Sequence, residues 1–591
     1  MAKPHGKPEV AKDFKNSSKK LLKALKKHLF GIIIATVFSV GSTAISIIGP
    51  DKVKELTNEI SVGISGTINM SNIFDIVIFL IGVCLFSIIC EVLQSFIMIN
   101  ISQNFSKNLR TKIAKKINVI PLKTFDNRPF GDILSIVTND VDVIFDGLYQ
   151  GLSNLTYSVF TLIGILVMMF ITNWQMSLTA IGSSLIGFLL VGMIMSKAHK
   201  YFEAQQKNLG IINGYIEEMY SGHNVISVYN AIPETKEAFE EYNKNLYKST
   251  QKASFLGSIM QPLMMFVGNL GYVMVCIVGG ILATKGTIDF GTIVAFVFYV
   301  RLFSNPLTTI TQSLTRMQVV IAAAERVFDF LEEEELSSEE SITDKLLPRK
   351  VKGNVEFRNV KFAYDDRPII KDFSVNIKAG QKVAIVGPTG AGKTTIVNLL
   401  MKFYDINDGD ILIDGHSIKN LTRSNIHDLF CMVLQNTWLF KGTIKENIAY
   451  NQNKLSDKDI IQACKLADID DFINSLPDKY DTVLTDNQSL SEGQKQLITI
   501  ARAIVDKSPF LILDEATSSV DRKTEEVVQK AMDELTKNRT SFIIAHRLST
   551  IQNADLILVL KDGDIIEQGT HNELLKKNGF YADLYNSQFE I

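Results

Sequence analysis

The chain has 591 residues and a formal net charge of −2, a balance that does not favour nucleic acid as its main partner. One hydrophobic core does not grow to this size, so two or more domains are expected. The mean hydropathy of +0.14, in a chain with 21% charged residues, averages an apolar part and a charged part. The five cysteines lack metal-binding spacing and are interpreted as reduced, structural residues.

Residues 1–28 form a basic segment with nine lysines, opposed by Glu9 and Asp13. They lack a cleavable signal pattern, because the apolar run that follows is long enough to cross a membrane. Lysine and leucine recur at helical spacing in residues 16–30, which predicts a helix along the membrane surface before the first span. The alternative for the first dozen residues is a disordered basic tail.

Six apolar runs follow, and each has about the 20 residues needed to cross a bilayer. They predict a transmembrane domain over residues 29–330 with spans near 29–48, 76–99, 152–171, 176–195, 255–283 and 290–311. Lysines gather on the N-terminal side of the first span, between spans two and three, and between spans four and five. The positive-inside rule therefore predicts a multi-pass protein of the cytoplasmic membrane with both termini in the cytosol.

The connections on the lysine-rich side are long, polar and helical in pattern. We expect the spans to continue into the cytosol as helices and to turn back near residues 127–132 and 220–223. Two interpretations remain open for these segments. They are solvated helical hairpins, or they are rods that carry motion between the membrane and a second domain.

Residues 331–350 are predicted to be a linker, and residues 351–591 a soluble α/β domain. The latter contains Gly387–Thr394, which matches G-x-x-x-x-G-K-[ST] between a predicted strand and a predicted helix. Glycines let the backbone N–H groups of such a loop surround phosphates, and the helix N-terminus adds positive charge. Lys393 can reach the outer phosphates, and Thr394 can bind Mg²⁺. ATP-binding residues are predicted at Gly387, Pro388, Thr389, Gly390, Ala391, Gly392, Lys393, Thr394 and Thr395.

A second apolar strand ends in two acidic residues, Asp514 and Glu515. Asp514 is a candidate ligand of Mg²⁺, and Glu515 a candidate general base that orients and deprotonates the attacking water. A solvated strand end is the alternative.

The pentapeptide at residues 490–494, Leu-Ser-Glu-Gly-Gln, precedes this strand by about twenty residues. With it, the chain resembles a half-molecule of the exporter type of ABC transporter, and most of all a subunit of bacterial heterodimeric multidrug exporters. The resemblance implies a multi-domain fold: an all-α domain of six transmembrane helices with cytosolic extensions, then an α/β P-loop nucleotide-binding domain. It also implies ATP and Mg²⁺ as cofactors and a second half-transporter as partner.

The resemblance extends to single residues. It implies catalytic roles for Glu515, His546 and Lys393, with His546 at the γ-phosphate, and it makes Gln435 a residue that senses the metal. Tyr364 would stack on adenine. Ser491, Gly493 and Gln494 would face an ATP held by the partner, with Ser491 and Gln494 in a capping box.

The sequence departs from the family pattern at Glu492, where glycine is usual, and again at residues 485–488. A carboxylate near a γ-phosphate is repelled, less so if it turns outward into water. We therefore expect a heterodimer with one hydrolytic and one weak ATP site. A homodimer that tolerates Glu492 is the alternative.

The expected function is ATP-driven efflux of lipophilic or amphipathic compounds by alternating access. Candidate substrate contacts are Phe298 and the intramembrane charges Glu91 and Arg301, although a salt bridge between spans is an equal explanation for these charges. Alternatives are a flippase for lipids or lipid precursors and a homodimeric exporter, with an ATP-gated channel or regulator less favoured because Glu515 is intact.

Overall fold

The computed structural model describes residues 12–589, except 66–67, 365–366, 435–436, 451, 453–454, 485–489, 515–521 and 545–550. The chain divides into two compact units, unit 1 from Met1 to Glu335 and unit 2 from Leu336 to Ile591.

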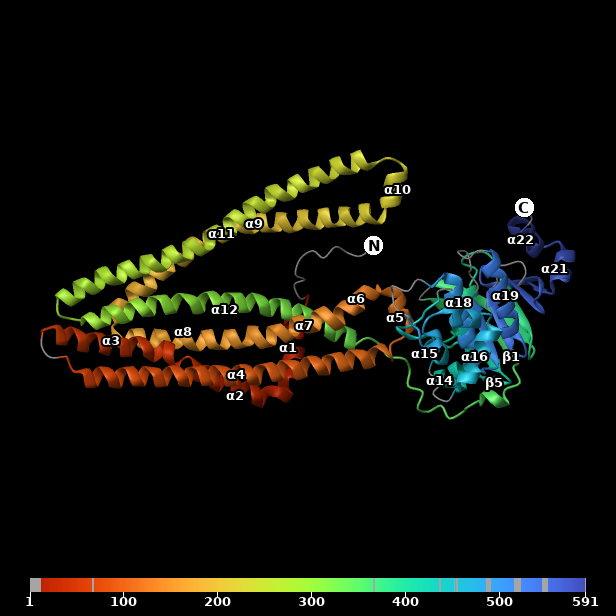
Figure 1. The fold of residues 1–591 in the computed structure, drawn as a ribbon, viewed down its shortest axis with the longest axis horizontal. Coiled ribbons are helices and arrows are strands. Elements are labelled where there is room, and N and C mark those ends of the chain that lie inside the picture. The colour runs from red at the N-terminus through yellow and green to blue at the C-terminus, as the bar shows by residue number, and fades with distance from the viewer. Residues whose placement is uncertain are drawn as a thin grey trace. The chain divides into compact units, whose positions relative to one another are not determined.

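The secondary-structure elements that the structure describes in unit 1 are all helices (Figure 1). Its elements are α1 (Phe14–Leu25), η1 (Lys26–His28), α2 (Leu29–Ser42), α3 (Ala44–Ser65), α4 (Met70–Ile117), α5 (Leu122–Asn127), α6 (Phe130–Ser135), the π-helix η2 (Ile136–Asp140), α7 (Val141–Asp146), the π-helix η3 (Gly147–Gly151), α8 (Leu152–Thr172), α9 (Trp174–Ser221), α10 (His223–Val228), α11 (Ile232–Thr284) and α12 (Phe290–Leu331).

Six helical stretches in the described residues are long and apolar enough to cross a membrane, as predicted. They are Phe14–Ser61, Met70–Ile117, Phe130–Thr172, Trp174–Ser221, Met265–Thr284 and Phe290–Leu331. The longest ones exceed what a bilayer needs: α4 and α9 have 48 residues each and α11 has 53. At 1.5 Å per residue, 48 residues extend about 72 Å, against about 30 Å of hydrocarbon. The predicted helical extensions beyond the spans are confirmed.

The predicted turns lie at the ends of these extensions, next to short helices. Arg128 and Pro129 separate α5 from α6, and Gly222 separates α9 from α10. Helices α9 and α11 form a hairpin that diverges from the other helices of unit 1 and is closed by α10 (Figure 1). Along this hairpin, the rings of Tyr215 and Tyr242 lie 5.1 Å apart.

The C-terminal end of α12 is tied by ion pairs to three other segments of unit 1. Lys20 of α1 pairs with Glu332 at 2.6 Å, and Lys116 of α4 pairs with Glu335 at 2.9 Å. Arg128, after α5, pairs with Glu333. The acidic run that ends unit 1 is therefore bound at several points by cations from earlier segments.

A further pair joins Arg326 of α12 to Asp140 of η2. The Nε of Arg326 donates to Asp140 Oδ2 at 2.9 Å, and the Asp140 side chain is only 3% exposed. About two turns away the same two segments pack closely, because a Cβ on Gly147 would lie 1.9 Å from Val320 Cγ2.

Unit 2 contains sheets covered by helices. Its strands are β1 (Val355–Tyr364), β2 (Arg367–Ile377), β3 (Lys382–Val386), β4 (Asp408–Ile413), β5 (His416–Ser417), β6 (Phe430–Val433), β7 (Gly442–Thr443), β8 (Val483–Leu484), β9 (Phe510–Asp514), β10 (Thr540–Ile544), β11 (Leu556–Lys561) and β12 (Asp564–Gly569). Its helices are η4 (Pro348–Lys350), α13 (Lys393–Leu400), η5 (Ile418–Asn420), α14 (Arg423–Leu429), α15 (Ile444–Ala449), α16 (Asp457–Leu466), α17 (Asp470–Ser475), η6 (Lys479–Asp481), α18 (Glu492–Val505), α19 (Arg522–Thr536), α21 (His571–Lys577) and α22 (Phe580–Phe589).

The central six-stranded sheet has the order β12-β11-β3-β10-β9-β6, and its strands from β11 to β6 are parallel. Successive side chains of a strand face opposite sides of the sheet. Accordingly Phe510 and Ile512 of β9 pack into one buried cluster, while Leu511 and Leu513 pack into another. This α/β architecture, after six apolar helical stretches, confirms the predicted fold class.

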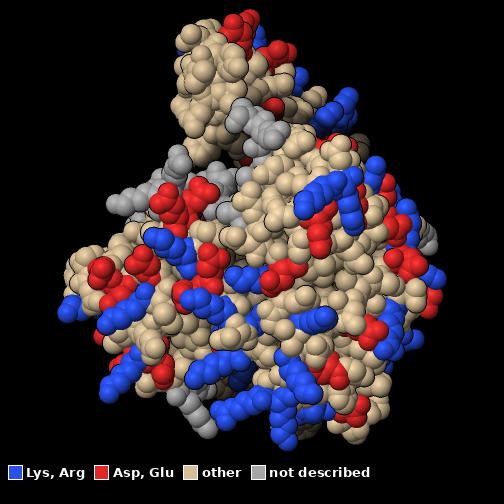
Figure 2. Space-filling view, turned by 90° about the vertical axis from the view of Figure 1, so that its right-hand side faces the viewer, with Lys and Arg blue, Asp and Glu red and all other residues tan. Residues whose placement is uncertain are grey.

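On the molecular face that Figure 2 presents, acidic and basic side chains are interspersed. Several large apolar side chains of unit 2 are nevertheless exposed, among them Trp438 at 58% and Tyr450 at 51%.

We expect Asp140→Asn to destabilise unit 1, because it removes one charge of a largely buried pair and leaves Arg326 with a weaker partner. The expected loss is about 1–3 kcal/mol, seen as an apparent unfolding temperature several degrees lower in detergent. Asp142→Asn is the matched control, since this carboxylate is 62% exposed where it pairs with Arg110. Equal effects of the two variants would contradict a special role for the buried pair.

Candidate nucleotide-binding site

The predicted phosphate loop lies at the carboxyl end of β3, in the central sheet of unit 2. Residues 383–386 of this strand are buried, and α13 begins at Lys393 immediately after the loop. A buried parallel strand that leads into a helix N-terminus is the arrangement that phosphate-binding loops require.

Glycine is needed at particular positions of this loop. The φ angles of Gly387, Gly390 and Gly392 are +155°, +84° and +97°, which side chains with a Cβ rarely adopt. A Cβ at Gly387 would lie 2.3 Å from the carbonyl oxygen of Leu560, whereas one at Gly390 would meet no heavy atom within 4 Å. The loop therefore packs tightly against β11 on one side and is open on the other. The residues present fit a polyphosphate cradle.

Lys393 is held over this loop. Its ammonium donates hydrogen bonds to the carbonyl oxygens of Gly387, at 2.7 Å, and Pro388, at 3.1 Å. The side chain is 8% exposed, and this burial lowers the pKa of Lys393, while Asp514 acts in the opposite direction. A largely desolvated cation close to the loop backbone is suited to bind phosphate oxygens.

Strand β10 lies between β3 and β9 and brings their ends to one edge. Ile544 pairs with Ile385 on one side and with Asp514 on the other. At about 4.8 Å per strand, the two strand ends lie about 10 Å apart. At this separation Asp514 acts to raise the pKa of Lys393, against the larger lowering by burial.

Three predicted site residues lie outside the described residues: Gln435, Glu515 and His546. Glu515 directly follows Asp514, the last residue of β9, and His546 comes two residues after the end of β10. Their predicted roles stay predictions.

Other loop residues differ in exposure. Thr394 is exposed, whereas Thr395 is 7% exposed, and the Ala391 side chain is buried.

Tyr364 is the last residue of β1, and its ring packs edge-on against Phe362 at 4.8 Å and Tyr404 at 5.0 Å. The hydroxyl of Tyr364 also accepts a hydrogen bond from Asn398 Nδ2 at 3.4 Å, which connects it to α13.

The predicted capping box at the start of α18 is confirmed. The N–H of Gln494 donates to Ser491 Oγ at 3.2 Å, and the Ser491 N–H donates to Gln494 Oε1 at 2.9 Å. Gly493 is buried in the first turn.

Glu492 has a partner that the sequence analysis did not consider. Its carboxylate forms an ion pair with Lys495 at 2.7 Å, and the Glu492 side chain is 58% exposed. Such an exposed pair contributes about 0–1 kcal/mol to stability, so the carboxylate remains free to reorient. The i,i+3 spacing on a helix was the signal that could have identified this pair.

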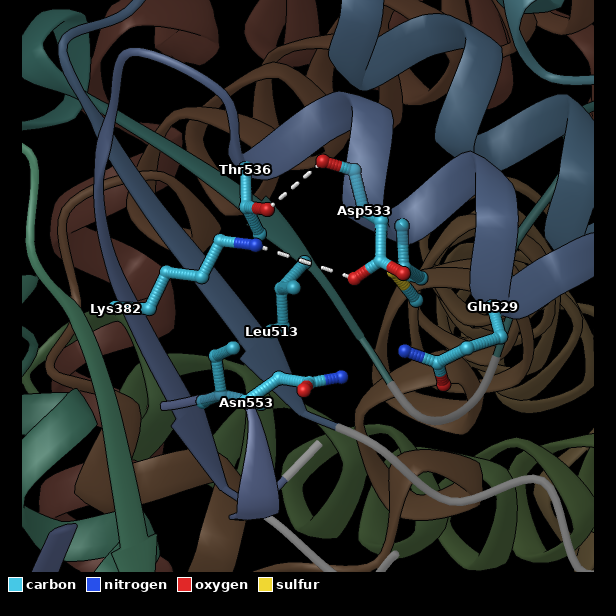
Figure 3. A pocket seen from close by; sticks show the side chains of 8 residues that line it. Lys382, Leu513, Gln529, Asp533, Thr536 and Asn553 are labelled. Carbon is cyan, nitrogen blue, oxygen red and sulfur yellow. Dashed lines mark hydrogen bonds and ion pairs between the residues drawn. The ribbon is translucent and has the colours of Figure 1, made fainter. Parts of the chain in front are cut away.

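A small cavity lies between the central sheet and α19 (Figure 3). Its volume is about 20 Å³, and Lys382 and Asp533 face each other across it at 4.0 Å. This space holds about one water molecule and is too small for a nucleotide.

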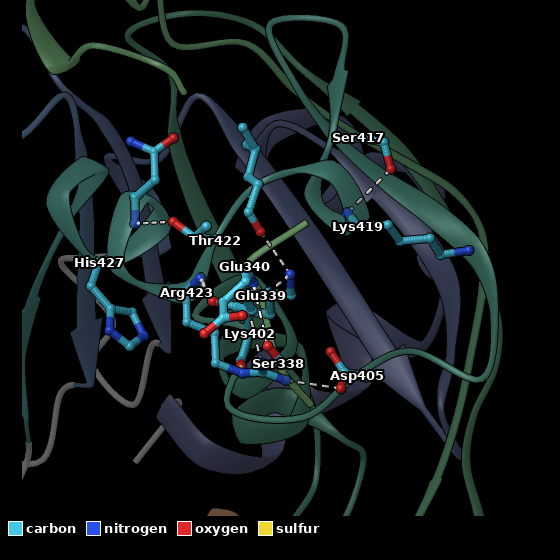
Figure 4. Close-up of polar contacts among 12 residues, drawn as sticks. Ser338, Glu339, Glu340, Lys402, Asp405, Ser417, Lys419, Thr422, Arg423 and His427 are labelled. Carbon is cyan, nitrogen blue, oxygen red and sulfur yellow. Dashed lines mark hydrogen bonds and ion pairs between the residues drawn. The ribbon is translucent and has the colours of Figure 1, made fainter. Parts of the chain in front are cut away.

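The segment before β1 is anchored to unit 2 by a charged cluster (Figure 4). Glu339 accepts hydrogen bonds from the backbone N–H of Arg423 and from its Nη1, both at 2.8 Å, and Lys402 lies 3.4 Å away. Asp405 completes the cluster at 2.9 Å from Arg423 Nη2. Glu339 is thus fixed a few residues beyond the end of unit 1.

The predicted substrate residues belong to unit 1. Phe298 and Arg301, one turn apart on α12, are exposed, with 43% of Phe298 accessible. Glu91 of α4 is also exposed, beside the buried Cys90. Within the described residues, neither charge takes part in an ion pair.

Comparisons with known proteins cover both units. Residues 32–307 match the family "ABC transporter transmembrane region", and residues 370–518 match the family "ABC transporter". The chain is 44% identical over 478 residues to a "Fatty acid ABC transporter ATP-binding/permease protein" of Mycobacterium tuberculosis, covering 80% of this chain and 75% of the relative.

Two further relatives extend this similarity. An "Uncharacterized ABC transporter ATP-binding protein YfiC" of Bacillus subtilis is 39% identical over 98% of this chain and 95% of its own length. An "ATP-dependent lipid A-core flippase" of Syntrophus aciditrophicus is 35% identical over 85% of this chain and 83% of its own length.

We expect Gly387→Ala to weaken nucleotide binding more than about tenfold, because the new Cβ would displace the loop from β11. Binding of a fluorescent ATP analogue to the purified chain measures this. Gly415→Ala is the matched control: its φ is also positive, at +85°, but its Cβ would meet no atom within 4 Å. An unchanged affinity in Gly387→Ala would contradict the assignment of the loop.

Proposed function

We propose that this chain, which belongs to the ABC transporter family and couples ATP hydrolysis to transport, exports lipophilic or amphipathic compounds as one half of a heterodimer. The observation that supports this best is the phosphate loop at the end of β3, with Lys393 within the electrostatic influence of Asp514. That site belongs to the same chain as six helical stretches able to cross a membrane.

In this proposal, Lys393 binds the outer phosphates, and the N–H groups of the loop bind the others. Thr394, Asp514 and Gln435 hold Mg²⁺ directly or through water. Glu515 orients and deprotonates the attacking water, and His546 contacts the γ-phosphate side of the site. When bound, ATP supplies a phosphoanhydride bond whose hydrolysis drives the change in access.

The start of α18 would form one half of an ATP site, here called the half-site, and a second chain would supply the other half. A partner subunit is proposed for this reason. Ser491, Gly493 and Gln494 lie at a helix N-terminus, where the dipole favours a phosphate held by another chain. Glu492 adds a carboxylate to that surface, and although Lys495 compensates it in part, the pair is exposed and weak. We infer that this half-site serves the weaker of two ATP sites, which favours a heterodimer over a homodimer.

The tip of the α9–α11 hairpin offers a surface for the partner. Four of its large apolar side chains are exposed: Tyr220 at 84%, Val225 at 60%, Val228 at 77% and Tyr229 at 78%. An exposed apolar patch of this kind is typical of an interaction site. We infer that the tip docks on the partner's nucleotide-binding domain, and that the long helices transmit motion between that domain and the spans.

The proposed cargo is an amphipath. The names of two relatives refer to a fatty acid and to lipid A-core. Arg301 and Phe298 together present a cation and an aromatic ring on the same exposed face of α12. A cation within a span is expensive unless it faces a cavity or a partner. The cation of Arg301 beside the ring of Phe298 favours a lipid-like cargo with an anionic head. A broader multidrug range is one alternative, and attraction of cationic cargo by Glu91 is another.

Both termini are proposed to lie in the cytosol of a bacterial cell, where ATP is available to unit 2. The basic segment before α2 and the lysine-rich extensions of the spans support this orientation.

We expect Glu515→Gln to reduce the ATPase rate of the assembled transporter by about 100-fold or more while it still binds ATP, because the general base is lost. The chain purified alone should hydrolyse ATP slowly, and co-purification with a half-transporter encoded by a neighbouring gene should raise the rate. Substantial ATPase by the chain alone would contradict the heterodimer. An active Glu515→Gln variant would contradict the role of Glu515.

Arg301→Gln should raise, about tenfold, the concentration of a long-chain carboxylate that stimulates ATPase half-maximally. The corresponding concentration of the matching alcohol should not change. Arg316→Gln is the matched control, because this arginine of α12 is also exposed but binds Gln150 at 2.8 Å. Equal effects on both cargoes would indicate a structural role for Arg301. No effect on the carboxylate would contradict contact with an anionic head.

A further inference from the structure

The N-terminal helix α1 has two unlike faces. Ser17, Leu21 and Leu25 are buried against the rest of unit 1. The opposite side carries a row of exposed lysines that continues into η1, namely Lys15, Lys19, Lys23, Lys26 and Lys27. At 3.6 residues per turn, these five side chains occupy about a third of the helix circumference.

This lysine row has no anionic partner in the part of the chain that the structure describes. Lys20, on the neighbouring side of the same helix, is paired with Glu332 at 2.6 Å. The five lysines of the row make no ion pair with a described carboxylate. Five unpaired cations on one side of a short helix repel one another, and an anionic surface would relieve that repulsion.

The position of the row in the chain identifies the surface. Helix α1 and η1 lead without interruption into α2, the first apolar helix, whose initial residues Leu29 and Phe30 are 54% and 78% exposed. Leu22, at the edge of the row, is 67% exposed. Apolar side chains beside a lysine row, just before a span, place the row at the depth of lipid headgroups.

We propose that the lysine row docks on anionic phospholipid headgroups of the leaflet in which α2 begins. Basic residues next to a span are attracted to anionic lipids and contribute individually to that attraction. The proposal depends on the membrane-spanning character of unit 1 and does not depend on the identity of the cargo or of the partner subunit.

The covered face of α1 links this docking to α12. The backbone N–H groups of Lys12 and Asp13 both donate to the Glu325 carboxylate at 2.8 Å. Leu21 and Leu25 share a buried cluster with Val327 and Phe330 of α12. A helix bound to headgroups on one side and to the end of α12 on the other therefore makes the position of α12 sensitive to lipid charge.

Labelling of lysines with an amine-reactive reagent tests the proposal on the full-length protein in nanodiscs. In discs that contain phosphatidylglycerol, the lysine row should react about fivefold more slowly than in discs of phosphatidylcholine alone. About 0.5 M salt should restore the reactivity. Lys236 is the internal control, because it is exposed on α11 and lies 19 residues before the predicted fifth span, about 28 Å along the helix.

Equal labelling of the row in the two kinds of disc would overturn the proposal. Protection that persists at high salt would also overturn it, because burial of apolar groups and not headgroup charge would then be the cause. Inorganic phosphate added to phosphatidylcholine discs should leave the row reactive, and protection by phosphate alone would contradict a lipid surface as the ligand.

A variant provides a second measurement. Phosphatidylglycerol should raise the apparent unfolding temperature of the wild-type protein, and should not raise that of a Lys19→Gln, Lys23→Gln, Lys26→Gln triple variant. The control carries Lys236→Gln together with Lys378→Gln and Lys576→Gln, two exposed lysines of unit 2, and should respond as the wild type does. Loss of the lipid effect in both variants would indicate a general effect of net charge and would contradict docking by α1.

Discussion

Parallel pairing of β3, β10 and β9 is the constraint on which the site in unit 2 depends. Because Ile544 pairs with both Ile385 and Asp514, the loop after β3 and the acidic end of β9 lie at one edge of the sheet. Buried side chains on both faces keep these strands in register. Lys393 and the acidic strand end therefore come to one edge of the sheet through strand pairing in the core, although they are about 120 residues apart in sequence.

In unit 1, ion pairs at the end of α12 have a comparable structural role. Its helices extend well beyond the thickness of a bilayer, and in these extensions α1, α4, α7 and α12 share a buried apolar cluster. Ion pairs from α1, α4 and the segment after α5 converge there on the end of α12. Asp140 and Arg326 add a largely buried contact. These polar contacts connect the last helix of the membrane unit with the first helix of the chain and with the α5–α6 turn.

Glu492 illustrates how local structure changes the interpretation of a sequence difference. Considered alone, a carboxylate at a phosphate-facing helix N-terminus is repulsive. In the structure it pairs with Lys495, one turn along the same helix, so a part of its charge is compensated. An exposed pair of this kind is weak, and it therefore moderates the repulsion without removing it. We therefore propose a weaker ATP site at this position, as opposed to an inactive one.

The sequence by itself determined the features that depend on local pattern. Apolar runs of sufficient length predicted six spans, the Gly387–Thr394 spacing predicted the loop between β3 and α13, and Ser491 with Gln494 predicted a capping box. Such features follow from residues a few positions apart, so they are visible in sequence. Only the tertiary structure decided that Asp140 binds Arg326, that Glu339 binds Arg423, and that α1 is fastened to α12. These contacts join residues 84 to 313 positions apart, and no local periodicity specifies which distant charge a buried or partly buried carboxylate will meet.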